Sequence, residues 1–193
     1  MSEKLAKIAG PKLILRPVVS EDLPFFVEMM EDGALAAFTG TYGGRFTLRE
    51  EEEYFEPSPE KVQFAVTMGG ELLGLVEFMA LDEISRSAEV GISIAHEHRN
   101  MGVGREALTL ILDYGFSVLN LQMIYLTAVE ENQRGIHLYE SLGFQRAGKL
   151  RRRRYLAGYR NVIYMDLLRE EWSAGPVAKQ LHRILSEPKR EYL

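Results

Sequence analysis

The chain has 193 residues, of which 46% are hydrophobic and 26% charged, a composition typical of one globular domain with a substantial core. Its net charge of −5 argues against nucleic acid as the main partner, and the absence of cysteine excludes disulfides, thiolate metal sites and a cysteine nucleophile. The N-terminal MSEKLAKIAG lacks the apolar core of a signal peptide, and no run approaches the ~18 apolar residues of a membrane span. We therefore expect a cytoplasmic protein that does not enter a membrane.

The first 55 residues predict a strand and two helices. Residues 13–19 (LILRPVV) form the strand, and Ser20 is a candidate N-cap for the first helix. A glycine-rich stretch over 33–46 follows, and we expect a loop that covers a site. The second helix begins at Thr47, where Glu50 completes a capping box.

The rest of the chain alternates strands and helices. Two glycines, Gly69 and Gly70, mark a hairpin turn, and three consecutive strands around them predict an antiparallel meander. The apolar spacing after this meander predicts a long helix, a fully buried strand, a helix ending at Gly143 and a final hairpin. The expected elements are strands 62–68, 71–81 and 88–95, helix 104–119, strand 123–129, helix 133–143 and a hairpin over 144–168.

Charged segments suggest other functions. Residues 141–165 hold seven basic residues and no acidic one, but a strand over 147–156 would place its arginines on alternate faces and dilute any patch for nucleic acid. The glutamates 50–53 form a run that is usually a solvated helix face. His96 and His98 have no apparent third ligand, so we expect no metal site.

The sequence HRNMGVG, at 98–104, is a glycine-rich turn before the long helix. It cannot be a P-loop, because the chain has no Gly-Lys-Ser/Thr. Gly102, Gly104 and Ala107 fit the dinucleotide pattern G-x-G-x-x-A, but the strand does not run directly into the first glycine. The turn is also suited to hold a pyrophosphate on successive N–H groups at the helix N-terminus, with Arg99 adding a charged hydrogen bond. A plain helix-capping turn is the remaining alternative.

The turn and its surroundings resemble the acetyl-CoA-binding core of the GNAT N-acetyltransferase superfamily. The matching pieces are HRNMGVG, EEN (130–132) and IHLYESLGF (136–144), and the likeness covers about residues 13–172. DYGFSVLNL, EENQRGIHLYESLGF and GYRNVIYM are most similar to bacterial spermidine N-acetyltransferases and to ribosomal-protein N-terminal acetyltransferases. The resemblance implies an α/β fold with a mixed, mostly antiparallel sheet that splays at its centre between flanking helices. We expect this domain over 1–172 and a tail, with one short helix at most, over 173–193.

The resemblance also assigns a cofactor site. The strand segment Ile92, Ser93 and Ile94 would pair with the pantetheine arm of acetyl-CoA and polarise the thioester carbonyl. Asn132 would hydrogen-bond the cofactor, although it is equally suited to be a helix N-cap. Many relatives carry lysine where Met101 stands, so that contact would use the backbone alone. The residues implied for the pyrophosphate are Arg99, Asn100, Met101, Gly102, Val103, Gly104 and Arg105.

The family's general acid corresponds to Tyr139. A phenol with a pKa of about 10 can protonate the departing thiolate when the amine attacks the thioester directly, and no covalent enzyme intermediate is needed. The alternative role of Tyr139 is to pack the helix. Glu77 and Glu89 are candidates to accept the amine proton, because each matches a glutamate of the polyamine enzymes; the alternative is that either side chain faces solvent.

Two acceptor classes remain open, a polyamine-like small amine and a protein N-terminus. The polyamine enzymes carry extra acids in the loop between the first two helices, where this chain has AAFTGTYGGRFT. A non-enzyme alternative is a CoA-binding or interaction module of the same fold. The resemblance further implies a homodimer or a larger homo-oligomer.

Overall fold

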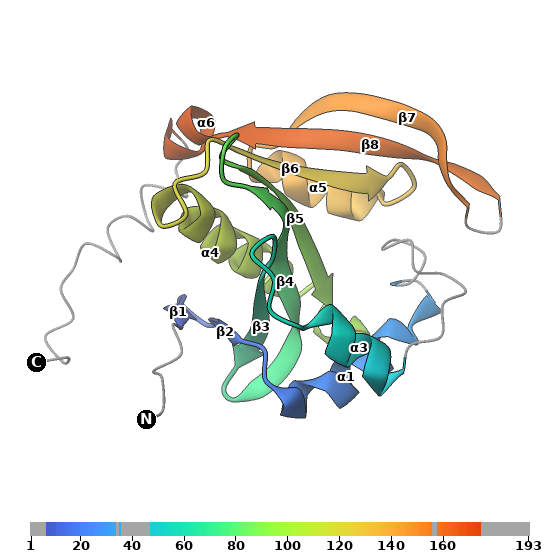
Figure 1. Cartoon of the computed structure of the whole chain (residues 1–193). Helices are drawn as coiled ribbons and strands as arrows, with labels where there is room; N and C mark the ends of the chain where they lie inside the picture. The colour runs from blue at the N-terminus through green and yellow to red at the C-terminus, as the bar shows by residue number, and fades with distance from the viewer. Residues whose placement is uncertain (1–6, 34, 36–46, 156–157, 175–193) are drawn as a thin grey trace, which may run out of the picture.

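The computed structural model describes residues 7–33, 35, 47–155 and 158–174, and its centre is one eight-stranded sheet (Figure 1). The strand order is β1-β2-β3-β4-β5-β6-β8-β7, and every neighbouring pair is antiparallel except β5 and β6, which are parallel. The mixed, mostly antiparallel sheet expected from the sequence is therefore confirmed. The strands are β1 Ile8–Ala9, β2 Ile14–Pro17, β3 Val62–Met68, β4 Glu71–Asp82, β5 Ser87–Ile94, β6 Met123–Val129, β7 Gln145–Tyr155 and β8 Tyr159–Leu168.

Helices cover both faces of the sheet, because adjacent positions of its strands point to opposite sides. Phe64 and Val66 of β3 enter a core cluster with the long helix α4, whereas Ala65 between them enters a second cluster with α1. The helices are α1 Leu23–Met30, α3 Leu48–Tyr54, α4 Val103–Ser117, α5 Gln133–Ser141 and α6 Arg169–Ala174, with single 3₁₀ turns at Ser20–Asp22 and His96–His98. Among the described residues, no helix is both long enough and apolar enough to cross a membrane.

The sheet opens between β5 and β6. Their parallel pairing runs from Ser87↔Met123 to Glu89↔Tyr125, and no pair follows. From Val90 onward, no strand among the described residues lies beside this edge of β5. The predicted splay is thus present, and it leaves main-chain groups of β5 available to a ligand.

Local expectations have mixed outcomes. The capping box of α3 is confirmed, because Glu50 N–H donates to Thr47 Oγ1 and Thr47 N–H donates to the Glu50 carboxylate. The N-cap at Ser20 is wrong: the chain first makes a 3₁₀ turn, and α1 begins only at Leu23 with Asp22 as its N-cap. The turn forms because the Asp22 carboxylate accepts the Val19 N–H at 2.9 Å.

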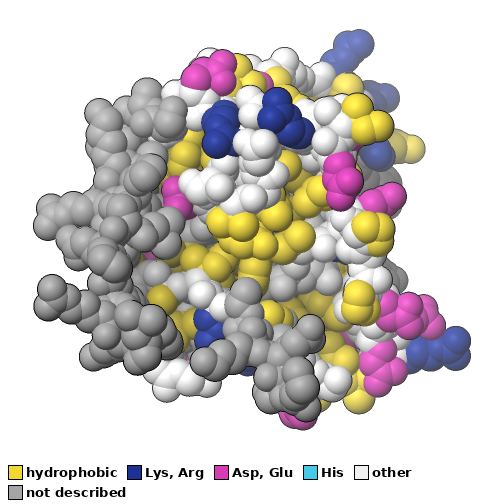
Figure 2. Space-filling model, turned by 60° about the vertical axis from the view of Figure 1, so that its left-hand side comes forward, with side chains coloured by type: hydrophobic (Ala, Val, Ile, Leu, Met, Phe, Trp, Pro, Cys, Tyr) yellow, Lys and Arg dark blue, Asp and Glu magenta, His cyan; other side chains and the backbone are white. Residues whose placement is uncertain are grey.

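Two strand expectations also need correction. β6 is not fully buried, since Met123, Tyr125 and Thr127 alternate with buried residues and are only half-buried. The arginines of β7 do not simply alternate, because the pairing with β8 shifts register between Leu150 and Arg154, and 151–153 are all exposed. On the face shown in Figure 2, the described Lys and Arg side chains nonetheless lie scattered among acidic and apolar ones.

Some boundaries differ from the expectation. The short edge strand β1 was not predicted, and β2 is shorter than 13–19 because it ends at Pro17. The helix α6 runs to Ala174, past the expected domain boundary at 172. Most of the expected loop over 33–46 and most of the tail over 173–193 lie outside the described residues.

Candidate active site

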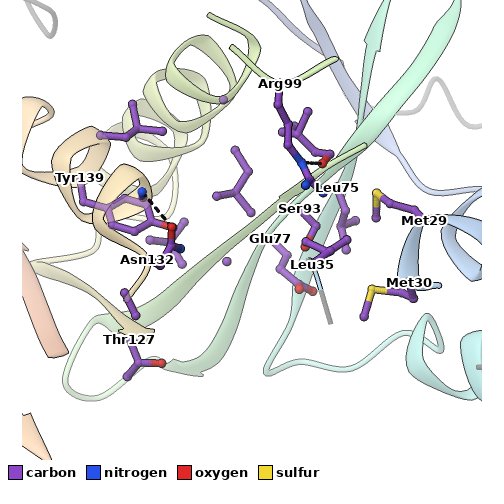
Figure 3. Close-up of a pocket in the computed structure, with 18 of the residues that line it drawn as sticks. Met29, Met30, Leu35, Leu75, Glu77, Ser93, Arg99, Thr127, Asn132 and Tyr139 are labelled. Carbon is purple, nitrogen blue, oxygen red and sulfur yellow. Dashed lines mark hydrogen bonds between the residues drawn. The ribbon is translucent and has the colours of Figure 1, made fainter. Parts of the chain in front are cut away.

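A cavity of about 910 Å³ lies where β5 and β6 diverge. Its walls divide into two halves with different chemistry. We call the part formed by β5, the start of α4 and α5 the cofactor half, and the part formed by α1, α3 and β4 the acceptor half. Figure 3 shows Tyr139 and Asn132 on one side of the cavity and Glu77, Met29, Met30 and Leu35 on the other.

The cofactor half begins with the glycine turn at the N-terminus of α4. Gly102 is the N-cap of this helix and has a φ of 83°, in the left-handed region that favours glycine. The first N–H groups of α4 have no partner within the helix, and the helix dipole favours an anion beside them. Gly102, Gly104 and Arg105 line the cavity, whereas Met101 is 61% exposed and the Val103 side chain is 5% exposed in the core. The turn therefore has the donor set that a diphosphate requires, and Val103 can reach it only through its backbone.

The open edge of β5 offers a second set of backbone groups. Ala95 N–H donates to Leu73 O on β4, so by strand alternation Ile92 and Ile94 turn their N–H and C=O groups away from β4, toward the splay. Ile94 O already accepts the Arg99 Nε–H at 2.8 Å. Ile92 thus has main-chain groups directed toward the splay, where an extended amide chain such as pantetheine could pair, whereas those of Ser93 face β4; the predicted pairing of Ile92–Ile94 with pantetheine stays a prediction.

The Arg99 side chain lies differently from the expectation. Its Nη2 is 2.8 Å from Asp32 Oδ2, and its Nε donates to Ile94 O. Its Nε is therefore hydrogen-bonded and its Nη2 ion-paired within the protein, instead of turned toward a phosphate. Other cations at the cavity are Arg105, whose guanidinium donates to Ser141 Oγ, and Arg134 on the exposed side of α5.

Asn132 caps α5, because its Oδ1 accepts the Gly135 N–H at 3.0 Å. It also lines the cavity. The N-cap role is therefore observed, and the predicted hydrogen bond to the cofactor stays a prediction.

Tyr139 lies on α5 and lines the cofactor half. Its ring packs edge-on against Phe144 with centroids 6.1 Å apart, and its hydroxyl has no hydrogen-bond partner among the described residues. Burial raises the pKa of Tyr139 to about 12, so the phenol keeps its proton at neutral pH. A protonated hydroxyl with no other partner is available to donate to a leaving thiolate.

Glu77 is the most confined carboxylate of the acceptor half, with 7% of the residue exposed. It accepts hydrogen bonds from the Tyr54 hydroxyl at 2.7 Å and from Gln63 Nε2 at 2.9 Å. Burial raises the pKa of Glu77 despite these bonds, and the nearby Glu89 raises it further. A carboxylate with a raised pKa is a better proton acceptor than an ordinary one.

Gly91, directly across from Glu77 on β5, keeps this carboxylate accessible. A Cβ at Gly91 would lie 2.9 Å from Met79 Cε and 3.4 Å from Glu77 Cγ. A side chain at this position would therefore occupy the space beside Glu77. Glu89, the second predicted acid, accepts a hydrogen bond at 2.9 Å from the hydroxyl of Thr127, which lies on β6 just beyond the last β5–β6 pair. Glu89 also lines the cavity.

The glutamate run of α3 is only partly a solvated face. Glu51 is 8% exposed and lines the cavity with Glu50, whereas Glu52 and Glu53 are exposed. Burial raises the pKa of Glu51, and the charges of Glu77 and Glu50 raise it further. One turn of α3 thus adds a buried acid to the site, which the general rule for charge runs does not predict.

Sequence reasoning missed several residues of the site. Tyr54 and Gln63 are brought to Glu77 by α3 and β3, and neither stands in a recognisable motif. His137 and Arg134 lie in the motif around Tyr139, and their place at the cavity follows from the period of α5. The helical period of α5 was the one sequence signal able to identify His137 and Arg134 as residues of the cavity.

The site and the fold together define a class of protein. The family model of the acetyltransferase (GNAT) domain matches residues 12–145, more than half of the chain. The chain belongs to the GNAT acetyltransferase family, and it is an N-acetyltransferase that uses acetyl-CoA as its cosubstrate.

The names of individual relatives agree with this family assignment. Spermidine N(1)-acetyltransferase of Escherichia coli K12 is 32% identical over 83% of this chain and 88% of that protein. A crystal structure of spermidine N-acetyltransferase from Vibrio cholerae in complex with CoA and spermine matches with a TM-score of 0.80 and 32% identity, over 84% of this chain and 99% of that one. A Bacillus subtilis protein, provisionally named a ribosomal N-acetyltransferase, is 30% identical over 58% of this chain and 61% of that protein.

Proposed function

We propose that this enzyme acetylates a primary amine of a flexible, polycationic acceptor such as spermidine. The observation that carries the proposal is the acceptor half, where the carboxylates of Glu51 and Glu77 lie among apolar side chains, with Glu89 of β5 beside them at the cavity. A polyamine has the matching chemistry, because its ammonium groups are spaced along methylene segments. The names of the Escherichia coli and Vibrio cholerae relatives support the same substrate class.

The proposed reaction is direct transfer. The amine nitrogen attacks the thioester carbon, a C–N bond forms, and the C–S bond breaks as the intermediate collapses. An N–H on the open edge of β5, such as that of Ile92, donates to the carbonyl oxygen as it gains negative charge. Tyr139 then donates its proton to the departing sulfur.

An ammonium acceptor must lose two protons in this reaction. One leaves before the nitrogen attacks, and the second leaves as the amide forms and replaces the proton that Tyr139 gave to the sulfur. Amines with a pKa near 10 are mostly protonated at neutral pH, so the site needs a proton acceptor. Glu77 fits this role because burial raises its pKa while Tyr54 and Gln63 fix its position. Glu89 stands at the splay and binds a second charge of the acceptor or relays the proton.

The test is the release of CoA thiol with a panel of amines. Spermidine and spermine are compared with butylamine, which has one charge, and with short peptides that carry free N-termini. We expect kcat/KM for the polyamines to exceed that for butylamine at least about tenfold, and to fall as salt screens the carboxylates. Peptides that react faster than the polyamines would reassign the enzyme to protein N-termini, and no reaction with any amine would support the non-catalytic alternative. The predicted homo-oligomer stays a prediction that sedimentation of the purified chain measures.

A further inference from the structure

An ion pair joins the acceptor half to the cofactor half. Arg99 Nη2 and Asp32 Oδ2 lie 2.8 Å apart, and both atoms are shut off from solvent. A second contact, from Arg99 Nε to Ile94 O at 2.8 Å, fixes the same guanidinium to the open edge of β5. Ion pairs at exposed sites contribute little, but a shielded pair holds its partners firmly because separating them leaves a buried charge.

Asp32 lies next to the wall of the acceptor half in the chain. It stands two residues after the end of α1, in a stretch where Met29, Met30 and Leu35 all line the cavity. Met29 and Leu35 are buried in one cluster with Leu75 of β4. An acceptor that orders these side chains therefore orders the backbone that carries Asp32.

Arg99 stands at the beginning of the phosphate-binding turn. Asn100 follows with a φ of 65° and Gly102 with a φ of 83°, so two of the next three residues are left-handed. A non-glycine residue adopts this conformation uncommonly, although asparagine does so more readily than most, and its surroundings help to keep it there. The anchored Arg99 supplies such a hold and thereby sets the direction of the amides that follow.

We propose that Asp32 is a positioning residue: through Arg99 it couples the order of the acceptor wall to the order of the phosphate-binding turn. CoA and the acceptor then bind with positive coupling, and by thermodynamic linkage each tightens the other by the same factor. The predicted effect of the acceptor on CoA binding rests on the proposed function. The predicted effect of Asp32 on the affinity for CoA alone does not, because that affinity is measured without any acceptor.

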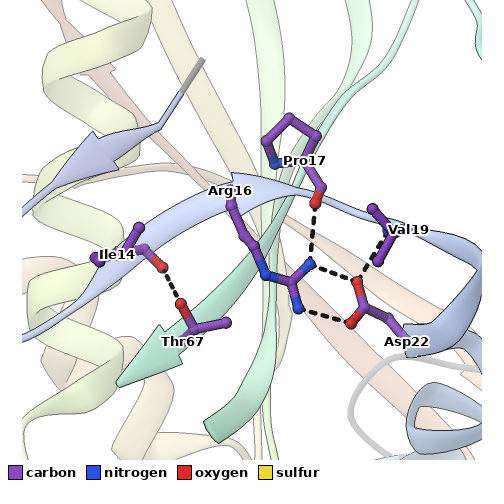
Figure 4. Close-up of polar contacts among 6 residues, drawn as sticks. All are labelled: Ile14, Arg16, Pro17, Val19, Asp22 and Thr67. Atoms are coloured by element: carbon purple, nitrogen blue, oxygen red, sulfur yellow. Dashed lines mark hydrogen bonds and ion pairs between the residues drawn. The ribbon is translucent and has the colours of Figure 1, made fainter. Parts of the chain in front are cut away.

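The chain contains a matched control. Arg16 and Asp22 form a two-point ion pair, with Nη1–Oδ2 at 2.6 Å and Nη2–Oδ1 at 2.7 Å, which ties β2 to the start of α1 (Figure 4). Neither residue lines the cavity or contacts the turn. Loss of this pair weakens the attachment of the same helix without touching the cofactor half.

The experiment is calorimetric titration of the full chain with CoA, in the absence and presence of saturating spermidine. CoA is used because it cannot be turned over. In the unmodified chain we expect spermidine to tighten CoA binding by about 5-fold or more. Asp32→Asn should weaken CoA binding roughly tenfold without spermidine and abolish the tightening, and Asp32→Glu should restore part of both. Asp22→Asn should lower Tm but keep the coupling factor.

Each contrary result overturns the inference. Tighter CoA binding by Asp32→Asn would mean that Asp32 withholds Arg99 from the phosphate, and unchanged binding would mean that the pair is only structural. Absence of coupling in the unmodified chain, or its equal loss in Asp22→Asn, would also refute the proposal. If Asp32→Asn does not fold, Arg99→Gln breaks the pair from the other side and should give the same loss. Spermidine that is bound by no variant and never acetylated would refute the proposed function, while the CoA affinities still decide the role of Asp32.

Discussion

The two halves of the cavity present different kinds of atoms to their substrates. The cofactor half offers backbone groups, from the turn around Gly102 and from the edge of β5 at Ile92. The acceptor half offers carboxylates, from Glu51 on α3 and Glu77 on β4. A backbone site depends on the path of the chain, so an exposed side chain such as that of Met101 does not have to take part in it. A side-chain site depends on each residue, so its specificity can change without a change of fold.

The largest expected effect falls on the proposed proton donor in the cofactor half. Tyr139→Phe removes only the hydroxyl, and we expect kcat to fall by about 10²–10⁴-fold because the thiolate loses its proton donor. Affinity for acetyl-CoA should change less than about 2-fold, because the ring and its packing on Phe144 are retained. Steady-state kinetics with calorimetry measures both. An unchanged kcat would leave Tyr139 a packing residue.

Glu77→Gln tests the acceptor half through its pH dependence. Glu77 accepts a proton only when it is ionised, and burial raises its pKa, so kcat/KM of the unmodified enzyme should fall as pH drops through that raised pKa. The variant should lose about 10²-fold in kcat and lose this acidic limb, with CoA affinity preserved. Profiles recorded from pH 5 to pH 9 compare the two proteins, with Glu53→Gln on the exposed face of α3 as the control. Superimposable profiles would assign the proton to another acceptor.

Gly102→Ala tests the cofactor half through the backbone. The φ of 83° at Gly102 is strained for alanine, at a cost of about 1–3 kcal/mol, or roughly 5–150-fold in CoA affinity if the turn reorganises. No atom lies within 4 Å of an added Cβ, so the effect would come from conformation and not from a clash. The KM for the amine should stay nearly constant. A rise of the amine KM alone would contradict the division of the cavity into two halves.

Glu51→Gln should produce the smallest change. We expect it to weaken binding of the amine and to raise the stability of the fold. Burial raises the pKa of Glu51 above its ordinary value, so between the two values the folded state binds more protons than the unfolded state. The free energy of unfolding therefore falls as pH rises through this window. At pH 7 the uncharged glutamine should raise Tm by a few degrees, about 2–4 °C, while the KM for spermidine rises several-fold. A lower Tm in thermal unfolding at pH 7 would show that Glu51 stabilises the fold.

Much of the fold could be predicted because its signals are local. The capping box at Thr47, the apolar period of α4 and the turn at Gly143 are each contained in a few adjacent residues. The expectation at Ser20 was wrong because the Asp22 carboxylate accepts the Val19 N–H and the chain makes a 3₁₀ turn before α1 begins. Burial of Glu51 was missed because only the packing of α3 beside β4 decides it.

The sequence by itself determined the family, the glycine turn and the residues expected to hold the cofactor, because a backbone site requires consecutive residues whose pattern can be read in order. Only the tertiary structure decided the acceptor half, since Tyr54, Gln63 and Glu77 come from three elements and meet only after β3, β4 and α3 pack. It also decided that Arg99 faces Asp32. Contacts between distant segments depend on how a chain folds back on itself, and this information is not contained in any single stretch of sequence.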